Sequence, residues 1–201
     1  PDIEEHLRKV AALVLTQAGE EESEALRAAR SFGKPLLDGV GPLPVPVWNT
    51  AFDGVYPKGD QWYWRGDFVE ELSDAAIDVH LQYHESMPTW KSTMHLYSID
   101  GAASRVGNEE TAWAYRHAKW GQVIAGVDPA PANAGAITDW ARSYSDALKP
   151  YVLAGGYSNF AMDEPDRVRG MYGTNYDRLA RIKSQYDPDN VFRVNQNIKP
   201  G

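Results

Sequence analysis

The 201-residue sequence contains no cysteine, which excludes disulfide bonds, thiolate zinc sites and a cysteine nucleophile within the chain. It also lacks any apolar run near the ~18 residues that a membrane-spanning helix needs. Basic residues are the minority, with 20 Lys and Arg against 28 Asp and Glu and a net charge of −8. An acidic surface repels phosphate backbones, so nucleic acid is not an expected partner.

The N-terminal segment carries acidic residues where a secretory signal peptide needs a basic region. The chain begins at Pro1 rather than at methionine, which indicates a piece cut from a longer protein. Its start therefore says little about location, and a cytoplasmic protein is the default expectation.

Aromatic residues are plentiful, with seven Trp and eleven Tyr. This excess fits a lined pocket, although the packing of a core also uses aromatic rings. The hydrophobic content of 43% is ordinary for a globular protein. A chain of this length is sufficient for one domain with a hydrophobic core.

Apolar residues recur at helical spacing in several segments. They predict helices over residues 3–17, 20–30, 75–84, 136–149 and 176–186. Ser73 or Asp74 is the expected N-cap of the third of these helices, and Thr174 is the expected N-cap of the last. A further helix is predicted over residues 111–126.

Proline and glycine divide the rest of the chain. Five prolines between Pro35 and Pro57 exclude a helix there and predict an extended, well-packed connection. Residues 61–69 and 151–160 are predicted strands, and residues 92–107 are predicted to form a strand, a glycine turn and a second strand. Together these segments predict an α+β fold in which helices cover an antiparallel sheet.

The C-terminal tail, residues 191–199, follows a turn signal at DPDN. Its alternation of side chains predicts an extended segment with one face formed by Phe192, Val194, Gln196 and Ile198. A tail that combines apolar anchors with amides is predicted to dock on another surface.

Several motifs resemble those of one family, the berberine-bridge-enzyme-like FAD-linked oxidases. The C-terminal resemblance is carried by YSNF at Tyr157–Phe160 and by YGTNYDRLARIKSQYDPDNVFRVNQNI. Upstream, four further motifs occur in the same order as in that family's substrate domain: PLLDGVGPLP, WNTAFDGVYPKGDQWYWRGDFVEELSDAAID, IDGAASRVG and TAWAYRHAKW. The resemblance covers the chain from about Lys34 to its end.

The resemblance implies that residues 1–201 are the substrate-binding domain of a two-domain FAD-linked oxidase, with the berberine-bridge-like segment at about 155–201. The chain shows no glycine-rich pyrophosphate loop, so we expect the family's N-terminal FAD-binding domain to lie outside it. That domain and a small-molecule substrate are the expected partners. FAD is expected to be bound mainly by that domain, and the isolated chain to be inactive.

The implied reaction oxidises a hydroxyl- or amine-bearing carbon and transfers a hydride to the flavin. In it, Tyr157 is the implied base for the substrate proton. A tyrosine ordinarily has a pKa near ~10, so a catalytic tyrosine needs a hydrogen-bond donor or a positive charge nearby. Tyr97, just before a DGA turn where the family has GGA, is the implied second catalytic tyrosine. Packing roles for both tyrosines remain the alternatives.

Five further side chains are predicted to contact the cofactor: Asn159, Asn175, Tyr176, Asn195 and Gln196. Amides match the N–H and C=O groups at the edge of a flavin. The resemblance places Asn159 nearest to the ring. The alternative for Asn175 and Asn195 is that they hold turns.

His95, Trp62 and Trp64 are the predicted substrate-pocket residues, because His95 shares a strand face with Tyr97 and the two tryptophans, which share a face of another strand, could form a stacking platform for a carbohydrate. The alternatives are a buried sheet face for the tryptophans and a satisfied polar neighbour for His95. His80 and His84 are four residues apart, but the intervening residues lack the glutamate of a zinc-protease motif. They are predicted to be solvated, and no metal site is expected.

A rival function comes from a different class of protein. In it the chain is a non-catalytic module, derived from the same domain, that binds a small molecule or a partner chain. Flavin colour on purification, or the sequence upstream of Pro1, distinguishes the two functions.

Overall fold

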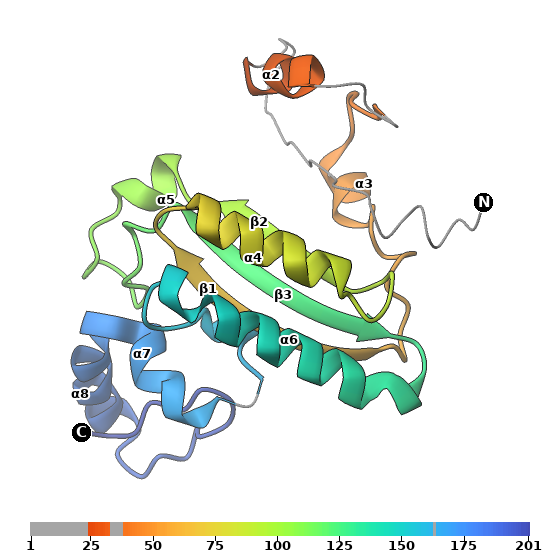
Figure 1. Cartoon of the computed structure of the whole chain (residues 1–201). Coiled ribbons are helices and arrows are strands. Elements are labelled where there is room, and N and C mark those ends of the chain that lie inside the picture. The colour runs from red at the N-terminus through yellow and green to blue at the C-terminus, as the bar shows by residue number, and fades with distance from the viewer. Residues whose placement is uncertain (1–23, 33–37, 163) are drawn as a thin grey trace. The chain divides into compact units, whose positions relative to one another are not determined.

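The computed structural model of the chain describes residues 24–32, 38–162 and 164–201. They belong to two units, Pro1–Lys58 and Gly59–Gly201 (Figure 1).

The described part of the first unit begins with a short helix, α2 (Glu24–Phe32). Its first turn contains Glu24 and its last turn Arg30, an arrangement that the helix dipole favours. It overlaps the helix predicted over residues 20–30. The helix predicted over residues 3–17 lies outside the described residues.

The proline-rich connection contains a helix, which corrects the prediction that it is wholly extended. This helix, α3 (Val45–Asn49), follows Pro44 and has a proline in its first turn. Proline is compatible with a first turn because the N–H groups there have no partner within the helix. The prediction of good packing is also wrong. Exposed apolar side chains line the connection: Val40, Leu43, Val45, Val47, Phe52 and Val55.

The second unit is built on an antiparallel sheet, as predicted. Among the described residues its strands are β1 (Gln61–Val69), β2 (Thr93–Ser98) and β3 (Trp120–Asp128). Their order across the sheet is β1-β3-β2, so β3 is central (Figure 1). β1 coincides with the strand predicted from the aromatic run QWYWRGDFV.

The central strand β3 shows that the helix predicted over residues 111–126 is wrong. After its first two residues, every residue of β3 is buried. A strand that is paired on both edges and buried on both faces shows a continuous apolar run rather than alternation. Periodicity alone does not separate such a strand from a buried helix.

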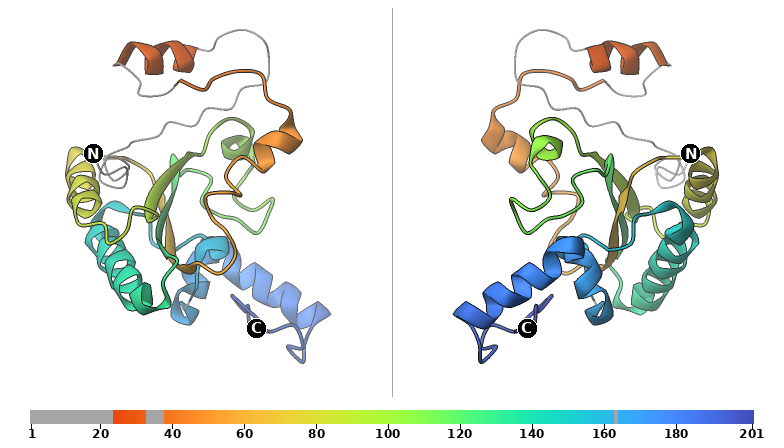
Figure 2. Two further views of the ribbon diagram at one scale, coloured as in Figure 1. Left: turned by 90° about the vertical axis from the view of Figure 1, so that its right-hand side faces the viewer. Right: turned by 90° about the vertical axis from the view of Figure 1, so that its left-hand side faces the viewer.

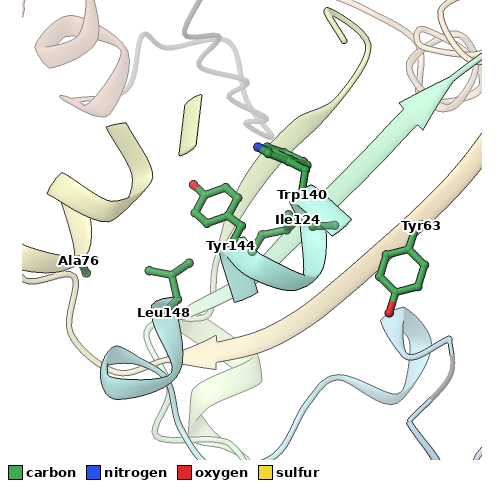
Figure 3. Close-up of a cluster of buried hydrophobic side chains, with 7 residues drawn as sticks. Tyr63, Ala76, Ile124, Trp140, Tyr144 and Leu148 are labelled. Carbon is green, nitrogen blue, oxygen red and sulfur yellow. The ribbon is translucent and has the colours of Figure 1, made fainter. Parts of the chain in front are cut away.

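Two helices, α4 (Asp74–Glu85) and α6 (Ala134–Leu148), lie side by side over one face of the sheet (Figure 2). Both were predicted, and Ser73 caps α4 by accepting a hydrogen bond from the N–H of Ala76. The side chains between these helices and the sheet form the main core (Figure 3): Tyr63, Ala76, Ile124, Trp140, Ala141, Tyr144 and Leu148.

Two predicted strands are replaced by other structure. After β2 the chain forms α5 (Gly101–Arg105) instead of a second strand. Residues 151–160 contain the end of one short 3-10 helix, η2 (Lys149–Tyr151), and the whole of another, η3 (Ser158–Phe160). Gly155 lies between them with φ 142°, a conformation that glycine adopts readily and that interrupts an extended strand.

The remaining helices are short. They are η1 (Pro131–Asn133), η4 (Pro165–Arg167), α7 (Val168–Tyr172), η5 (Gly173–Asn175) and α8 (Tyr176–Tyr186). The segment from Pro165 to Asn175 is therefore largely helical. The last predicted helix is confirmed as α8, but its N-cap residue is Asn175 rather than Thr174. No helix within the described ranges has the length and apolar character needed to cross a membrane.

The tail after α8 is not the extended strand that its alternation predicts. Asn190 and Asn195 have φ of 51° and 59°, which breaks the regular alternation of faces. Phe192 and Val194 are 80% and 81% exposed. The first half of the predicted apolar face is therefore not buried against the described residues, whereas Gln196 and Ile198 are half-buried.

Candidate functional site

Side chains from β1 and β2 lie on the same face of the sheet, the face opposite α4 and α6. Residues directly opposite each other in antiparallel strands point to the same face, and alternate residues share that face. Trp64 pairs with Ala125, which pairs with Thr93 on β2. By the same register, the predicted residues Trp62, Trp64, His95 and Tyr97 all belong to this face.

Tyr157 joins the same face through Phe68. Phe68 and Tyr97 are both paired with Gly121, so the three residues form one row across the sheet. The Tyr157 ring packs on Phe68 with centroids 5.6 Å apart, and on Phe160 with centroids 5.2 Å apart. The fold thus brings both predicted catalytic tyrosines to one side of the sheet, separated by a residue without a side chain.

The segment that carries Tyr157 is fixed to β1 by its backbone. The N–H of Tyr157 donates to the carbonyl of Gly66 at 3.1 Å, and the N–H of Leu153 donates to the carbonyl of Phe68 at 2.8 Å. Tyr157 itself is half-buried in a small aromatic cluster with Phe68 and Tyr115. Its ring is therefore held while one edge remains accessible.

Each catalytic candidate has a polar partner. The side-chain N–H of Asn159 donates to the hydroxyl oxygen of Tyr157 at 2.9 Å. The hydroxyl of Tyr97, which is 51% exposed, is 3.1 Å from Nδ1 of His95. His95 in turn contacts the hydroxyl of Thr93 through Nε2 at 2.8 Å. Burial lowers the pKa of His95, which favours the neutral imidazole.

The two pocket tryptophans do not lie parallel. The rings of Trp62 and Trp64 are 5.7 Å apart with an interplanar angle of 62°, and Trp64 meets Phe160 at 78°. Edge-to-face packing of this kind builds an aromatic wall rather than a flat stacking platform. The wall extends the apolar surface next to Tyr157.

The chain is similar to known proteins in both sequence and fold. The family described as "Berberine and berberine like" matches residues 156–199. An FAD-linked oxidoreductase of Dictyostelium discoideum is 27% identical over 95% of this chain and 42% of its own length. YgaK of Bacillus subtilis, an uncharacterized FAD-linked oxidoreductase, is 31% identical over 83% of this chain and 39% of its own length. The chain belongs to the berberine-bridge-enzyme-like family of FAD-linked oxidases.

A solved structure shows the same fold. BBE-like #28 from Arabidopsis thaliana superposes with a TM-score of 0.65 at 20% identity, over 72% of this chain and 34% of that protein. The chain thus spans about two fifths of the length of the curated relatives named above. The family match begins at Gly156, next to Tyr157, and runs to the end of the tail.

Asn175 lies apart from the aromatic face. It is only 2% exposed, and its side-chain N–H groups donate to the carbonyls of Asn108, Thr111 and Ala112 at 2.6–3.3 Å. These contacts tie the start of α8 to the loop before β3. They favour the alternative in which Asn175 holds a turn.

The other predicted cofactor residues are spread over the C-terminal segment. Tyr176 is covered by the guanidinium of Arg169, 4.7 Å from its ring centroid. Gln196 donates to the carbonyl of Ala161 at 2.9 Å, and Asn195 beside it adopts a positive φ. Asn195 and Gln196 line one shallow hollow, but no described contact joins either to Tyr157.

The histidine pair on α4 is not solvated as predicted. His80 is buried, and its Nδ1 lies 2.6 Å from the hydroxyl of Tyr144 in the core. His84 is half-buried. In the part of the chain that the structure describes, no group of three or more His, Asp or Glu side chains is placed to hold a metal ion.

Sequence reasoning missed the charged group behind Tyr157. Asp67 belongs to the RGD triplet of β1 and is buried at 2% exposure, where it contacts Arg167. The available signal was the one carboxylate in a strand rich in aromatic residues, because a buried charge requires a partner. Nothing in the sequence indicated which arginine supplies it.

Proposed function

We propose that this chain forms the substrate-binding and C-terminal part of an FAD-dependent oxidoreductase that oxidises a hydroxyl- or amine-bearing carbon. The observation that carries the proposal is the shared position of Tyr157 and Tyr97. They come from segments 60 residues apart. Tyr97 and Phe68, the residue on which Tyr157 packs, nevertheless lie on the sheet face opposite the helices, on either side of Gly121. Family membership supports the same chemistry.

The donors on this face fit one edge of a flavin ring. Asn159 is exposed and offers an amide, Tyr97 offers an exposed hydroxyl, and Trp62 and Trp64 offer an apolar wall. A flavin presents N–H and C=O groups that amides and hydroxyls match. We assign Asn159 the nearest contact, with Tyr176 and Asn195 as more distant candidates. Asn175 and Gln196 donate to backbone carbonyls, which weakens their assignment.

In the proposed reaction, the substrate hydroxyl or amine gives its proton to Tyr157, and its carbon loses a hydride, which leaves a C=O or C=N product. A bound flavin supplies the hydride acceptor. The side-chain N–H of Asn159 points at the oxygen of Tyr157 and would stabilise negative charge on it. Tyr97, fixed by His95, positions a second polar group of the substrate.

We further propose that residues 1–201 work with an N-terminal FAD-binding domain of the same protein, which holds most of the cofactor. The exposed side chains of Phe192 and Val194, together with Val191 at 69% exposure, offer an apolar docking surface for that domain. Burial of each contributes about 1.5–3 kcal/mol. The prediction that the tail docks on another surface therefore stands as a proposal.

The substitution Tyr157→Phe tests the function in the full-length protein. It removes one hydroxyl and keeps the ring packing on Phe68 and Phe160. A general base contributes typically ~10²–10⁴-fold, so flavin reduction is expected to slow by about that factor while bound flavin is retained. The measurement is anaerobic stopped-flow bleaching by glucose, benzyl alcohol or benzylamine, whichever reduces the wild type fastest.

Tyr186→Phe is the matched control, because Tyr186 lies at the end of α8 and is 78% exposed. It is expected to reduce its flavin at the wild-type rate. Wild-type speed in Tyr157→Phe would show that Tyr157 only packs. A full-length protein without flavin would instead favour a non-catalytic binding module.

A further inference from the structure

Arg167 joins three parts of the second unit behind Tyr157. Its Nη2 donates to Oδ1 of Asp67 on β1 at 2.6 Å and also to the carbonyl of Gly155. Its Nη1 donates to Oε1 of Glu164 at 2.5 Å. Asp67 and Arg167 are 100 residues apart in the chain, so these contacts exist only in the folded unit.

Burying the charged carboxylate of Asp67 is energetically unfavourable. Burial raises its pKa, and the charge of Arg167 opposes that rise. Only the Asp67 partner of this ion pair is deeply buried, since the Arg167 side chain is 34% exposed. The pair constrains the geometry because a buried carboxylate left without its partner is strongly unfavourable. The position of the Arg167 guanidinium is therefore fixed by a carboxylate that is only 2% exposed.

The Arg167 guanidinium contacts Gly155, which precedes Tyr157 by two residues in the chain. It holds the carbonyl of Gly155, while the N–H of Tyr157 is held by the carbonyl of Gly66, the neighbour of Asp67. Gly156 lies between these two contacts. A Cβ at Gly156 would be 3.1 Å from Nη2 of Arg167 and 3.1 Å from the Gly66 carbonyl, so the slot has little spare room.

We propose that Arg167, held by Asp67, is a positioning residue for Tyr157: it sets the height and direction of the tyrosine above the sheet through the Gly155 carbonyl. Only the expected effect of Arg167 on catalysis rests on the proposed function. The geometric part, that Arg167 fixes the Gly155–Phe160 segment, holds whatever the reaction is.

The geometric part is tested by hydrogen–deuterium exchange on the 201-residue chain. Arg167→Met is expected to speed exchange of the Tyr157 amide. Asp67→Asn is expected to have a smaller effect in the same direction, because it removes one of the two carboxylate charges that contact Arg167 and leaves Glu164 in place. Arg167→Lys is expected to lie between wild type and Arg167→Met, since an ammonium group carries the charge but lacks the planar fork. Arg181→Met, at an exposed position on α8, is the matched control.

The catalytic part is tested in the full-length protein by combining Arg167→Met with Tyr157→Phe. A reacting group misplaced by about 1 Å loses ~10²-fold in rate. Arg167→Met alone is therefore expected to slow flavin reduction by roughly 10–100-fold, with the same panel of glucose, benzyl alcohol and benzylamine. In the Tyr157→Phe background the same change is expected to cause no further loss, because the group that Arg167 positions is already gone.

Three results would overturn the proposal. Unchanged exchange at Tyr157 in Arg167→Met would show that Arg167 does not fix the segment. An equal loss of rate with and without the Tyr157 hydroxyl would show that Arg167 acts on stability or on another group. If Arg167→Met melts below the assay temperature, Arg167→Lys replaces it in the exchange and the flavin-reduction experiments. Wild-type behaviour of Arg167→Lys in both experiments would then be the third result that refutes the proposal. If no panel compound bleaches the flavin, the proposed function fails while the exchange result still decides the geometry.

Discussion

Replacing Gly126 by alanine tests the contact that holds α6 on the sheet. Gly126 is in the central strand β3 and faces that helix. A Cβ at this position would lie 2.6 Å from the carbonyl oxygen of Ile137 and 2.8 Å from its Cβ. The nearest atom belongs to the backbone of α6, so no side-chain rotation relieves the overlap and the helix itself must shift.

The expected magnitude is the difference between two effects. Alanine restricts the unfolded chain and by itself stabilises by about 0.4–1 kcal/mol. Overpacking of a filled core typically costs about 1–3 kcal/mol, and a clash with helix backbone belongs in the upper part of that range. The net result for Gly126→Ala is a loss of about 2 kcal/mol in the free energy of unfolding.

Gly121→Ala is the matched control on the same strand. A Cβ at Gly121 would meet only the Cδ1 of Ile99 at 3.9 Å, which is an ordinary contact. This variant is expected to be as stable as wild type or more stable by a few tenths of a kcal/mol. Its Cβ projects between Phe68 and Tyr97, so any effect on turnover without an effect on stability would report on the aromatic face.

Urea denaturation followed by circular dichroism measures both variants. For a domain of this size, a loss of ~2 kcal/mol also lowers the melting temperature by roughly 4–8 °C. Equal stability of the Gly126→Ala and Gly121→Ala variants would refute the reasoning, because it would mean that α6 does not pack on β3 as closely as the structure shows.

Two further predictions concern pH and the tail. Burial lowers the pKa of His80 below its usual ~6.5, so below about that pH the unfolded chain binds more protons and the free energy of unfolding falls. His80→Gln is expected to flatten that decline between about pH 7 and pH 5, whereas exposed His117→Gln is expected to keep it; equal slopes in denaturant titrations would contradict this. Phe192→Ser is expected to change the stability of the 201-residue chain by less than about 0.5 kcal/mol, because an exposed side chain contributes little. In the full-length protein the same change is expected to weaken docking of the FAD-binding domain, seen as faster exchange of residues 191–199, and equal exchange in both forms would refute the docking proposal.

The sequence was sufficient for elements whose signals are local. α4 and α6 have apolar stripes of helical period, and Ser73 marks the start of α4. β1 is rich in aromatic residues and ends just before the acidic pair Glu70 and Glu71. The family resemblance came from short motifs at Tyr157 and in the tail, which are readable without any fold.

Tertiary structure decided the elements whose signals are not local. β3 has the same apolar density as a buried helix, and only its two strand partners identify it as the centre of the sheet. Residues 151–160 have strand-like composition, yet Gly155 turns the chain and interrupts any regular ladder. Local propensity is a weak guide where pairing partners are distant in the sequence.

The candidate site divides in the same way. The family resemblance of the sequence selected Tyr157, Tyr97 and Asn159 as candidates. It could not show that Phe68, on which Tyr157 packs, lies in one row with Gly121 and Tyr97, or that Asp67 contacts Arg167. Those relations depend on strand register and on a buried charge whose partner is 100 residues away, and both are fixed only when the packed chain excludes water.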